Sequence, residues 1–253
     1  MSQLQAIKVL AVEFMHYPDF LIRDLHIPSI TMRSNLKLNS EDVGGFAITN
    51  DHSISLDVPD TLWDKLENMD WQAEFRDTLH HELYHLMDPI FQEGQIAVET
   101  YANWVNLNPK GIMAYGNQPI NSQERPIGFA RAYGTKNPQE DRATVFEALM
   151  TGVDFSTNDT VLTQKVASIR QQVFHLSHGL MDVQALSHTV AMRMRMISRN
   201  YNRLALCGME PLFATVTDEE YSSWQRHYTD ILRKHDEEDA RRHTSGGDIF
   251  LDR

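Results

Sequence analysis

The stretch that most restricts how this chain can fold is residues 81–85, which read His-Glu-Leu-Tyr-His. Residues four apart lie on the same face of a helix, so the imidazoles of His81 and His85 can reach one metal ion, with Glu82 beside it. The surrounding segment predicts such a helix over about residues 71–87. Its apolar residues recur with helical spacing at Phe75, Leu79, Leu83 and Leu86.

This motif has the chemistry of a zinc hydrolase. A catalytic zinc ion usually has three protein ligands and keeps its fourth position for water, whose pKa it lowers towards neutrality. A neighbouring carboxylate can then take the proton of that water and pass it to the leaving group. Glu82 stands in the position of this general base. We therefore expect Zn²⁺ as the cofactor; the alternative is a chance match in a helix with ordinary histidines.

A third ligand must come from elsewhere, because two histidines do not complete a catalytic zinc site. The best candidate is Glu140, which opens a predicted helix over residues 140–150 and shares one of its faces with Glu147. Ala143 lies on the same face and is small enough to let that helix approach the motif helix closely. Asp141 and Glu147 are alternative ligands.

Two further positions near the predicted site have competing roles. Residues 137–140 read Asn-Pro-Gln-Glu, which fits a helix N-cap, a first-turn proline and a capping-box glutamate. In that role Glu140 would turn back onto its own helix. Asp88 shares the face of His81 and His85 but lies far along the axis, so we expect an outer-sphere or local backbone role for it.

These segments resemble a known family. Residues 81–88 (His-Glu-Leu-Tyr-His-Leu-Met-Asp), 128–134 (Gly-Phe-Ala-Arg-Ala-Tyr-Gly) and 140–143 (Glu-Asp-Arg-Ala), followed by Phe146, resemble the catalytic domain of anthrax lethal factor-like metallopeptidases. The Pro-Pro endopeptidases are similar, and all belong with the thermolysin-like enzymes that use glutamate as the third ligand. The resemblance covers about residues 43–152.

The resemblance implies a role for each matching residue. Zinc would be bound by His81, His85 and Glu140, with Glu82 as general base. The phenol of Tyr133, seven positions before the glutamate, would face the metal and stabilise an oxyanion. Without the resemblance, Tyr133 before a glycine-containing turn reads as a packing residue.

This chain departs from the family at Thr144. The family places an acidic residue four positions after its glutamate ligand, and Thr144 occupies that position here. We expect weaker outer-sphere support for His81 or His85, with more effect on catalytic efficiency than on metal binding.

The segment before the motif helix predicts a β-hairpin. Residues 43–49 and 53–58 read as strands around a polar turn, and a short helix is predicted over residues 61–66. An extended peptide could pair with an exposed edge of this sheet, although an ordinary sheet edge fits equally well.

The rest of the chain predicts mainly helices. A helix is predicted over residues 94–106, and a long loop with several prolines and glycines follows it to residue 126. The loop fits either a border of a substrate cleft or a plain connector. Beyond residue 138, helical apolar spacing recurs over residues 161–176, 183–206 and 217–232.

Together these patterns predict an α+β fold. A zincin-like catalytic domain with a small sheet would occupy residues 1–152, a helical subdomain residues 153–236, and a solvated tail residues 237–253. We expect a zinc-dependent metallopeptidase acting on a peptide or protein substrate. The rivals are a non-catalytic interaction protein that contains zinc, and a zinc amidase acting on a non-peptide substrate.

Composition narrows the setting. A formal charge of −12 and a pI near 5.4 argue against a nucleic-acid partner bound through a broad basic face. A single cysteine, Cys207, excludes an intramolecular disulfide and suits a reducing compartment. No secretory signal or membrane-length apolar run is visible, so we expect a cytoplasmic protein without a membrane partner, while export as an effector would leave the same pattern.

Overall fold

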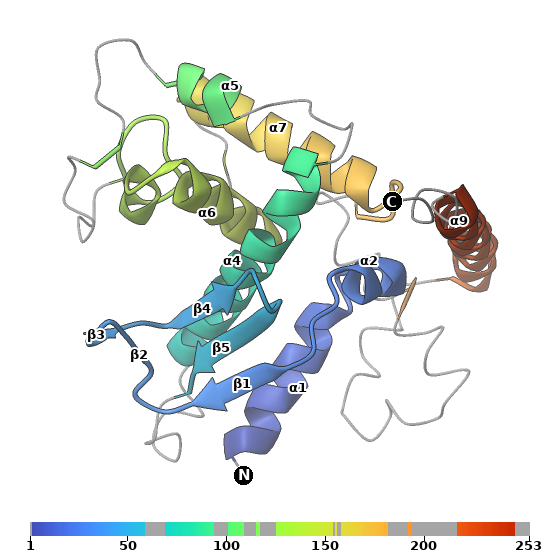
Figure 1. Ribbon diagram of the computed structural model, residues 1–253, viewed down its shortest axis with the longest axis horizontal. Coiled ribbons are helices and arrows are strands. Elements are labelled where there is room, and N and C mark those ends of the chain that lie inside the picture. The colour runs from blue at the N-terminus through green and yellow to red at the C-terminus, as the bar shows by residue number, and fades with distance from the viewer. Residues whose placement is uncertain are drawn as a thin grey trace, which may run out of the picture.

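The structure is a computed structural model, and its described residues form helices, a small three-stranded sheet and a separate two-stranded pair (Figure 1). This mixed composition agrees with the predicted α+β class. The predicted helix at residues 61–66, most of that at 183–206, and Cys207 lie outside the described residues. The residues that the structure describes are 2–58, 69–93, 101–108, 115–116, 125–153, 155, 158–181, 192–193 and 217–245.

A three-stranded sheet lies beside the motif helix. Its strands, in spatial order, are β1 (Ile30–Arg33), β5 (Ser53–Asp57) and β4 (Gly45–Ile48). The β4–β5 pair is antiparallel and confirms the predicted hairpin, whereas β1 runs parallel to β5. Among the described strands β4 pairs only with β5, so its other edge is not paired with a described strand. A separate short pair consists of β2 (Lys37–Leu38) and β3 (Glu41–Asp42).

The motif helix is α4 (Met69–Glu93), which packs against the sheet on one side and against helix α6 on another (Figure 1). All four residues of the predicted apolar stripe are buried. The helix continues beyond the predicted end at residue 87 and contains Pro89. Proline has no N–H for the carbonyl four residues back, so it weakens a helix, but here it does not end α4.

Strand β4 lies very close to α4 because it begins with glycine. A Cβ atom on Gly45 would lie 2.6 Å from Thr78 Cγ2 and 3.0 Å from the carbonyl oxygen of Ser55. Both distances are shorter than carbon contacts in packed proteins, so a side chain there would push the strand away from the helix. Glycine at this position therefore keeps the edge strand beside the motif.

Helix α6 (Pro138–Met150) packs against α4 and against α7 (Thr160–Leu176). It is buried on almost all sides, and its charged residues have buried partners. Asp141 Oδ2 lies 2.6 Å from the Nζ atom of Lys165, and Arg142 lies 3.0 Å from Asp88. These ion pairs tie α6 to both neighbouring helices.

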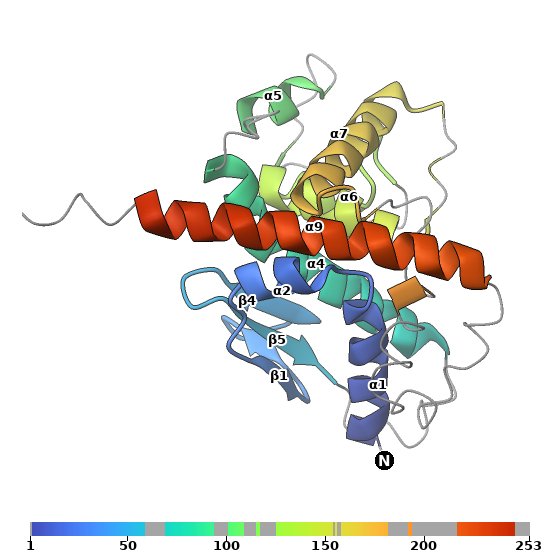
Figure 2. The same cartoon turned by 90° about the vertical axis from the view of Figure 1, so that its right-hand side faces the viewer.

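The remaining helices enclose this centre. Their bounds are α1 (Ser2–Phe14), α2 (Asp19–Asp24), α5 (Tyr101–Asn106) and α9 (Asp218–Ser245). Figure 2 shows α9 lying across the molecule in front of α2 and α4, and its Tyr228 and Ile231 join the main hydrophobic core. Helix α9 ends at Ser245, so the expected tail, which begins at residue 237, is helical up to that residue. Most of the described residues in this part of the helix are exposed.

Candidate metal centre

The structure brings His81, His85 and Glu140 together. His81 and His85 lie on adjacent turns of α4, and Glu140 lies in the first turn of α6. One potential ligand atom from each residue lies within 4.8 Å of the other two. The spatial convergence that the sequence predicted is therefore observed.

The separations of these atoms fit a small tetrahedral cation. Glu140 Oε2 lies 2.9 Å from His81 Nε2 and 3.3 Å from His85 Nε2, and the two Nε2 atoms are 3.1 Å apart. Zinc bonds of about 2.0–2.1 Å in a tetrahedron place neighbouring donor atoms about 3.3 Å apart. Two imidazole nitrogens and a carboxylate are also the donor types that zinc binds in catalytic sites. The residues present therefore fit zinc.

The start of α6 directs the Glu140 carboxylate towards the histidines. The side chain of Asn137 accepts a hydrogen bond from the Glu140 backbone N–H at 2.9 Å, and Pro138 occupies the first turn. Asn137 alone thus caps the helix, as the sequence predicted. The competing capping-box role of Glu140 is wrong, because its carboxylate contacts the two imidazoles instead.

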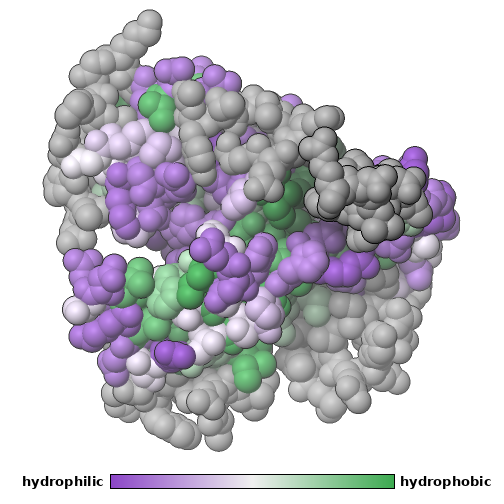
Figure 3. Space-filling view, viewed as in Figure 1, coloured by the Kyte–Doolittle hydropathy of each residue, from purple (hydrophilic) through white to green (hydrophobic). Residues whose placement is uncertain are grey.

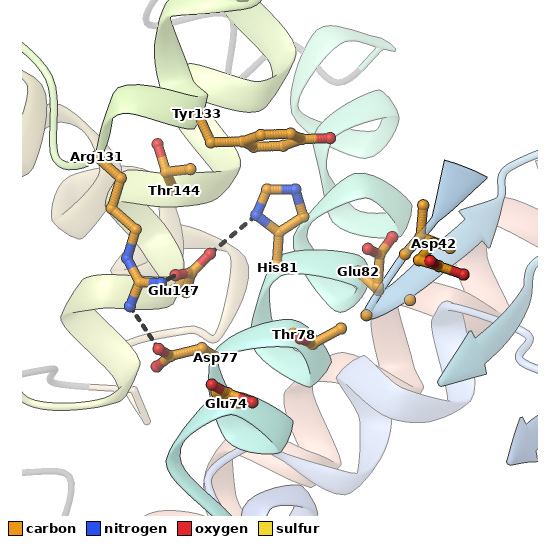
Figure 4. A pocket seen from close by; sticks show the side chains of 13 residues that line it. Asp42, Glu74, Asp77, Thr78, His81, Glu82, Arg131, Tyr133, Thr144 and Glu147 are labelled. Atoms are coloured by element: carbon orange, nitrogen blue, oxygen red, sulfur yellow. Dashed lines mark hydrogen bonds and ion pairs between the residues drawn. The ribbon is translucent and has the colours of Figure 1, made fainter. Parts of the chain in front are cut away.

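Glu147 takes the outer position next to His81. Its Oε2 lies 3.0 Å from His81 Nδ1, and its Oε1 forms an ion pair with Arg131 at 2.9 Å. Arg131 also pairs with Asp77 of α4 (Figure 4). A carboxylate that accepts from the second ring N–H of a metal-binding histidine fixes the tautomer and the orientation of the ring.

For His81, the structure corrects the expectation that Thr144 weakens its outer-sphere support. The Thr144 hydroxyl donates to the carbonyl oxygen of Asp141 at 2.9 Å. The acidic partner of His81 comes instead from Glu147, one turn further along α6. Positions four and seven after Glu140 lie on the same helical face, so either can reach α4.

The other acidic residues considered from the sequence lie away from the cluster. Asp141 is fully buried and accepts hydrogen bonds from Trp104, Tyr115 and Lys165. Asp88 accepts a hydrogen bond from buried Arg142 at 3.0 Å, which is an ion pair between α4 and α6.

Without metal, the cluster is held by charge. Burial opposes a charge on His81, but Glu140 and Glu147 outweigh it and raise the pKa of His81 to about 10. Burial likewise opposes ionisation of Glu140, and its contacts with His81 and His85 hold the pKa of this carboxyl well below its usual range. A metal ion would replace the proton on His81 Nε2, which faces Glu140, and leave the Nδ1 proton on the side of Glu147.

Glu82 and Tyr133 flank the imidazole of His81 (Figure 4). Burial raises the pKa of Glu82 above its ordinary value, although the neighbouring His81 and His85 oppose this rise. The Tyr133 ring centre lies 5.8 Å from that of His81, and its hydroxyl lies 3.4 Å from Glu140 Oε1. Tyr133 is 40% exposed, so it borders the site and is not a core packing residue.

Lys136 also reaches this phenol. Its ammonium donates to the Tyr133 oxygen at 3.0 Å and lies 3.2 Å from Glu140 Oε1. Burial raises the pKa of Tyr133, and the contact with Lys136 opposes that rise. The phenol therefore remains protonated at neutral pH and can donate a hydrogen bond.

A cavity of about 340 Å³ adjoins the cluster. Gly45 at the start of β4 and Gly44 just before it line this cavity, together with His81, Arg131 and Tyr133. In Figure 3 the molecular surface is notched on the left, between the side chains over α6 and those over the sheet. The cluster can therefore be reached from solvent along the edge strand.

Sequence reasoning missed the outer partners of the site. It named Glu147 only as a substitute ligand, and it assigned no role to Arg131 or Lys136. Their signal was present, since Arg131 belongs to the segment that carries the family resemblance and Lys136 lies four residues before Glu140. The contacts of Glu147 and Arg131 depend on how α6 meets α4, which spacing alone does not give, whereas those of Lys136 are local, with Tyr133 and Glu140.

A comparison with known protein families finds no match, and neither do comparisons with curated proteins and with solved structures. Within the described residues, none of the helices combines the length and apolar character needed to cross a bilayer.

Proposed function

We propose that this chain is a zinc-dependent metallopeptidase with a zincin-like catalytic domain, of the type that uses glutamate as third ligand. The main support is the set of three donor atoms on His81, His85 and Glu140, separated by 2.9–3.3 Å, with Glu82 adjacent to His81 in the motif. The family resemblance of the same residues points the same way.

Each of these residues has a defined task in peptide hydrolysis. Zinc held by His81, His85 and Glu140 would supply Lewis acidity, which polarises a carbonyl and makes water a better nucleophile near neutral pH. Glu82 takes a proton from the attacking water and then gives it to the departing amine nitrogen. Tyr133 donates its hydroxyl proton in a hydrogen bond to the oxygen that becomes negatively charged.

The neighbouring residues support these tasks. Glu147 accepts from His81 Nδ1–H and so keeps Nε2 directed at Glu140 and His85. Lys136 contacts both the phenol of Tyr133 and Glu140, so it fixes the position of the one against the other.

An extended peptide fits the approach to this site. Strand β4 has one edge that pairs with no described strand, and Gly44 and Gly45 of that region line the cavity beside Glu82. Main-chain groups of such an edge can pair with a peptide laid along it, which would present successive peptide bonds to the cluster. We therefore propose a peptide or protein substrate.

The experiment compares zinc-loaded wild type with Glu82→Gln on a peptide library, with zinc measured in both. Glu82→Gln removes the base but no ligand, so we expect unchanged zinc content and loss of most turnover. Full activity of Glu82→Gln would contradict the assigned role.

Two other outcomes would support the rivals. If the wild type holds zinc but cleaves no peptide, and a protein side chain fills the fourth zinc position, the zinc-containing interaction protein is favoured. Hydrolysis of small amides but not of peptides would favour the amidase.

A further inference from the structure

A second group of potential metal-binding side chains lies on another side of α4, facing α1. Glu13 comes from the last turn of α1, His16 from the turn that follows it, and His80 from α4. One potential ligand atom from each lies within 4.8 Å of the other two. His80 precedes His81, but one residue turns a helix by about 100°, so His80 faces α1 and not the cavity.

Two separations between the donor atoms resemble those of the first cluster, and the third, between the two histidines, is within 4.8 Å. Glu13 Oε2 lies 3.0 Å from His80 Nε2 and 3.2 Å from His16 Nδ1. These distances are close to the separation of about 3.3 Å between neighbouring ligands of a tetrahedral zinc ion. Two imidazoles and one carboxylate again supply the donors.

His16 gives independent support for a bound cation. Its Nδ1 atom is buried and makes no hydrogen bond of good geometry, and its contact with Glu13 Oε2 at 3.2 Å is an ion pair only if the ring is protonated. A buried nitrogen without a hydrogen bond is unfavourable in a native fold. A cation between His16 and the Glu13 carboxylate would use the lone pair of that nitrogen.

The other atoms of these side chains have partners of the kind that metal ligands have. The Tyr17 hydroxyl lies 2.6 Å from His80 Nδ1, and Arg76 Nε donates to Glu13 Oε1 at 2.8 Å. Without metal, Tyr17 can donate to Nδ1 while His80 Nε2–H donates to Glu13. With metal, Nδ1–H donates to Tyr17 instead, so Nε2 becomes a ligand and the buried contact is kept.

We propose that Glu13, His16 and His80 form a second metal site, for zinc or another divalent first-row transition ion. The ion would join α1 to α4 behind the first cluster and would have a structural role. Glu13 is the only carboxylate in this group, and the neighbouring Arg76 is positively charged, although its side chain is 44% exposed to solvent. We therefore expect weaker binding here than at His81, His85 and Glu140, where Glu82 and Glu147 add negative charge.

The sequence held a signal for this site. Glu13 and His16 form a Glu-x-x-His pair, a spacing that brings both side chains together at the end of α1, with His16 in the turn after the helix. A partner 64 residues further along the chain, His80, could not be identified from spacing.

The experiment measures zinc per chain by equilibrium dialysis at fixed free zinc, followed by elemental analysis. We expect two zinc ions in the wild type, one in His16→Ala and one in His85→Ala. His227→Ala, which changes an exposed histidine of α9, is the matched control and should keep two. During a chelator titration the ion that depends on His16 should leave first.

The results separate the two sites. A single zinc in the wild type that is retained by His16→Ala and lost by His85→Ala would overturn the second site and leave the first intact. Two ions in the wild type that both persist in His16→Ala would also overturn it. Because His16→Ala could alter folding, circular dichroism is measured on each sample. If that variant is unfolded, the number of zinc ions in the wild type decides: two support the second site, and one overturns it.

Discussion

Metal removal should leave His81 protonated far above the pH at which histidine normally loses its proton. Its Nδ1 lies 3.0 Å from Glu147 and its Nε2 lies 2.9 Å from Glu140, so the imidazolium can donate to both carboxylates. Burial opposes the charge, but these contacts raise the pKa from 6.5 to about 10.

The shift links the stability of the metal-free fold to pH. A raised pKa in the folded state means that the contribution is fully present below the unfolded value of 6.5 and is lost as the pH rises to about 10. One pKa unit corresponds to about 1.4 kcal/mol, so His81 contributes at most about 5 kcal/mol to the free energy of unfolding. In zinc-loaded protein this loss should be absent, because the metal replaces the proton on Nε2.

Two measurements test this expectation. Nitrogen NMR of the imidazoles in metal-free protein should place the His81 midpoint near 10, and urea unfolding should give a lower free energy at about pH 9.5 than at pH 6.5. Glu147→Gln should lower the midpoint, whereas Thr144→Val should leave it in place because Thr144 bonds to the Asp141 carbonyl. A His81 midpoint near its ordinary value would refute the reasoning.

Three substitutions test other parts of the account. Tyr133→Phe should lower kcat by about 100- to 1000-fold with zinc content unchanged, and an unaltered kcat would remove this residue from the mechanism. Lys165→Met should cost about 3–5 kcal/mol in urea unfolding, because it leaves the buried carboxylate of Asp141 without its cation; a cost below about 1 kcal/mol would show that the pair contributes little. Gly45→Ala should cost about 1–3 kcal/mol and reduce peptide cleavage, since its Cβ would lie 2.6 Å from a side-chain carbon of α4, and equal stability to wild type would contradict the close packing of β4.

The elements that the sequence predicted correctly depend on local chemistry. The β4–β5 hairpin follows from alternating residues around a polar turn, and the start of α6 follows from Asn137 and Pro138. The burial of Phe75, Leu79, Leu83 and Leu86 in α4 follows from their helical spacing. Each signal lies within a few residues of the structure that it specifies.

The partners that the sequence did not reveal join distant segments. The Glu147–His81 contact spans 66 residues, and the Arg142–Asp88 contact spans 54. Helix α6 is buried on almost all sides, so its pattern of polar and apolar residues does not indicate which face meets α4. The family resemblance directed attention to Thr144, while the packing of the two helices places Glu147 against His81.

The most direct test of the proposed metal site is anomalous diffraction from crystals of the zinc-loaded protein, measured on both sides of the zinc absorption edge. We expect a peak about 2.0–2.2 Å from Nε2 of His81, Nε2 of His85 and a carboxylate oxygen of Glu140, with no protein side chain in the fourth position. Crystals equilibrated with zinc that show no peak among these three residues would contradict the account.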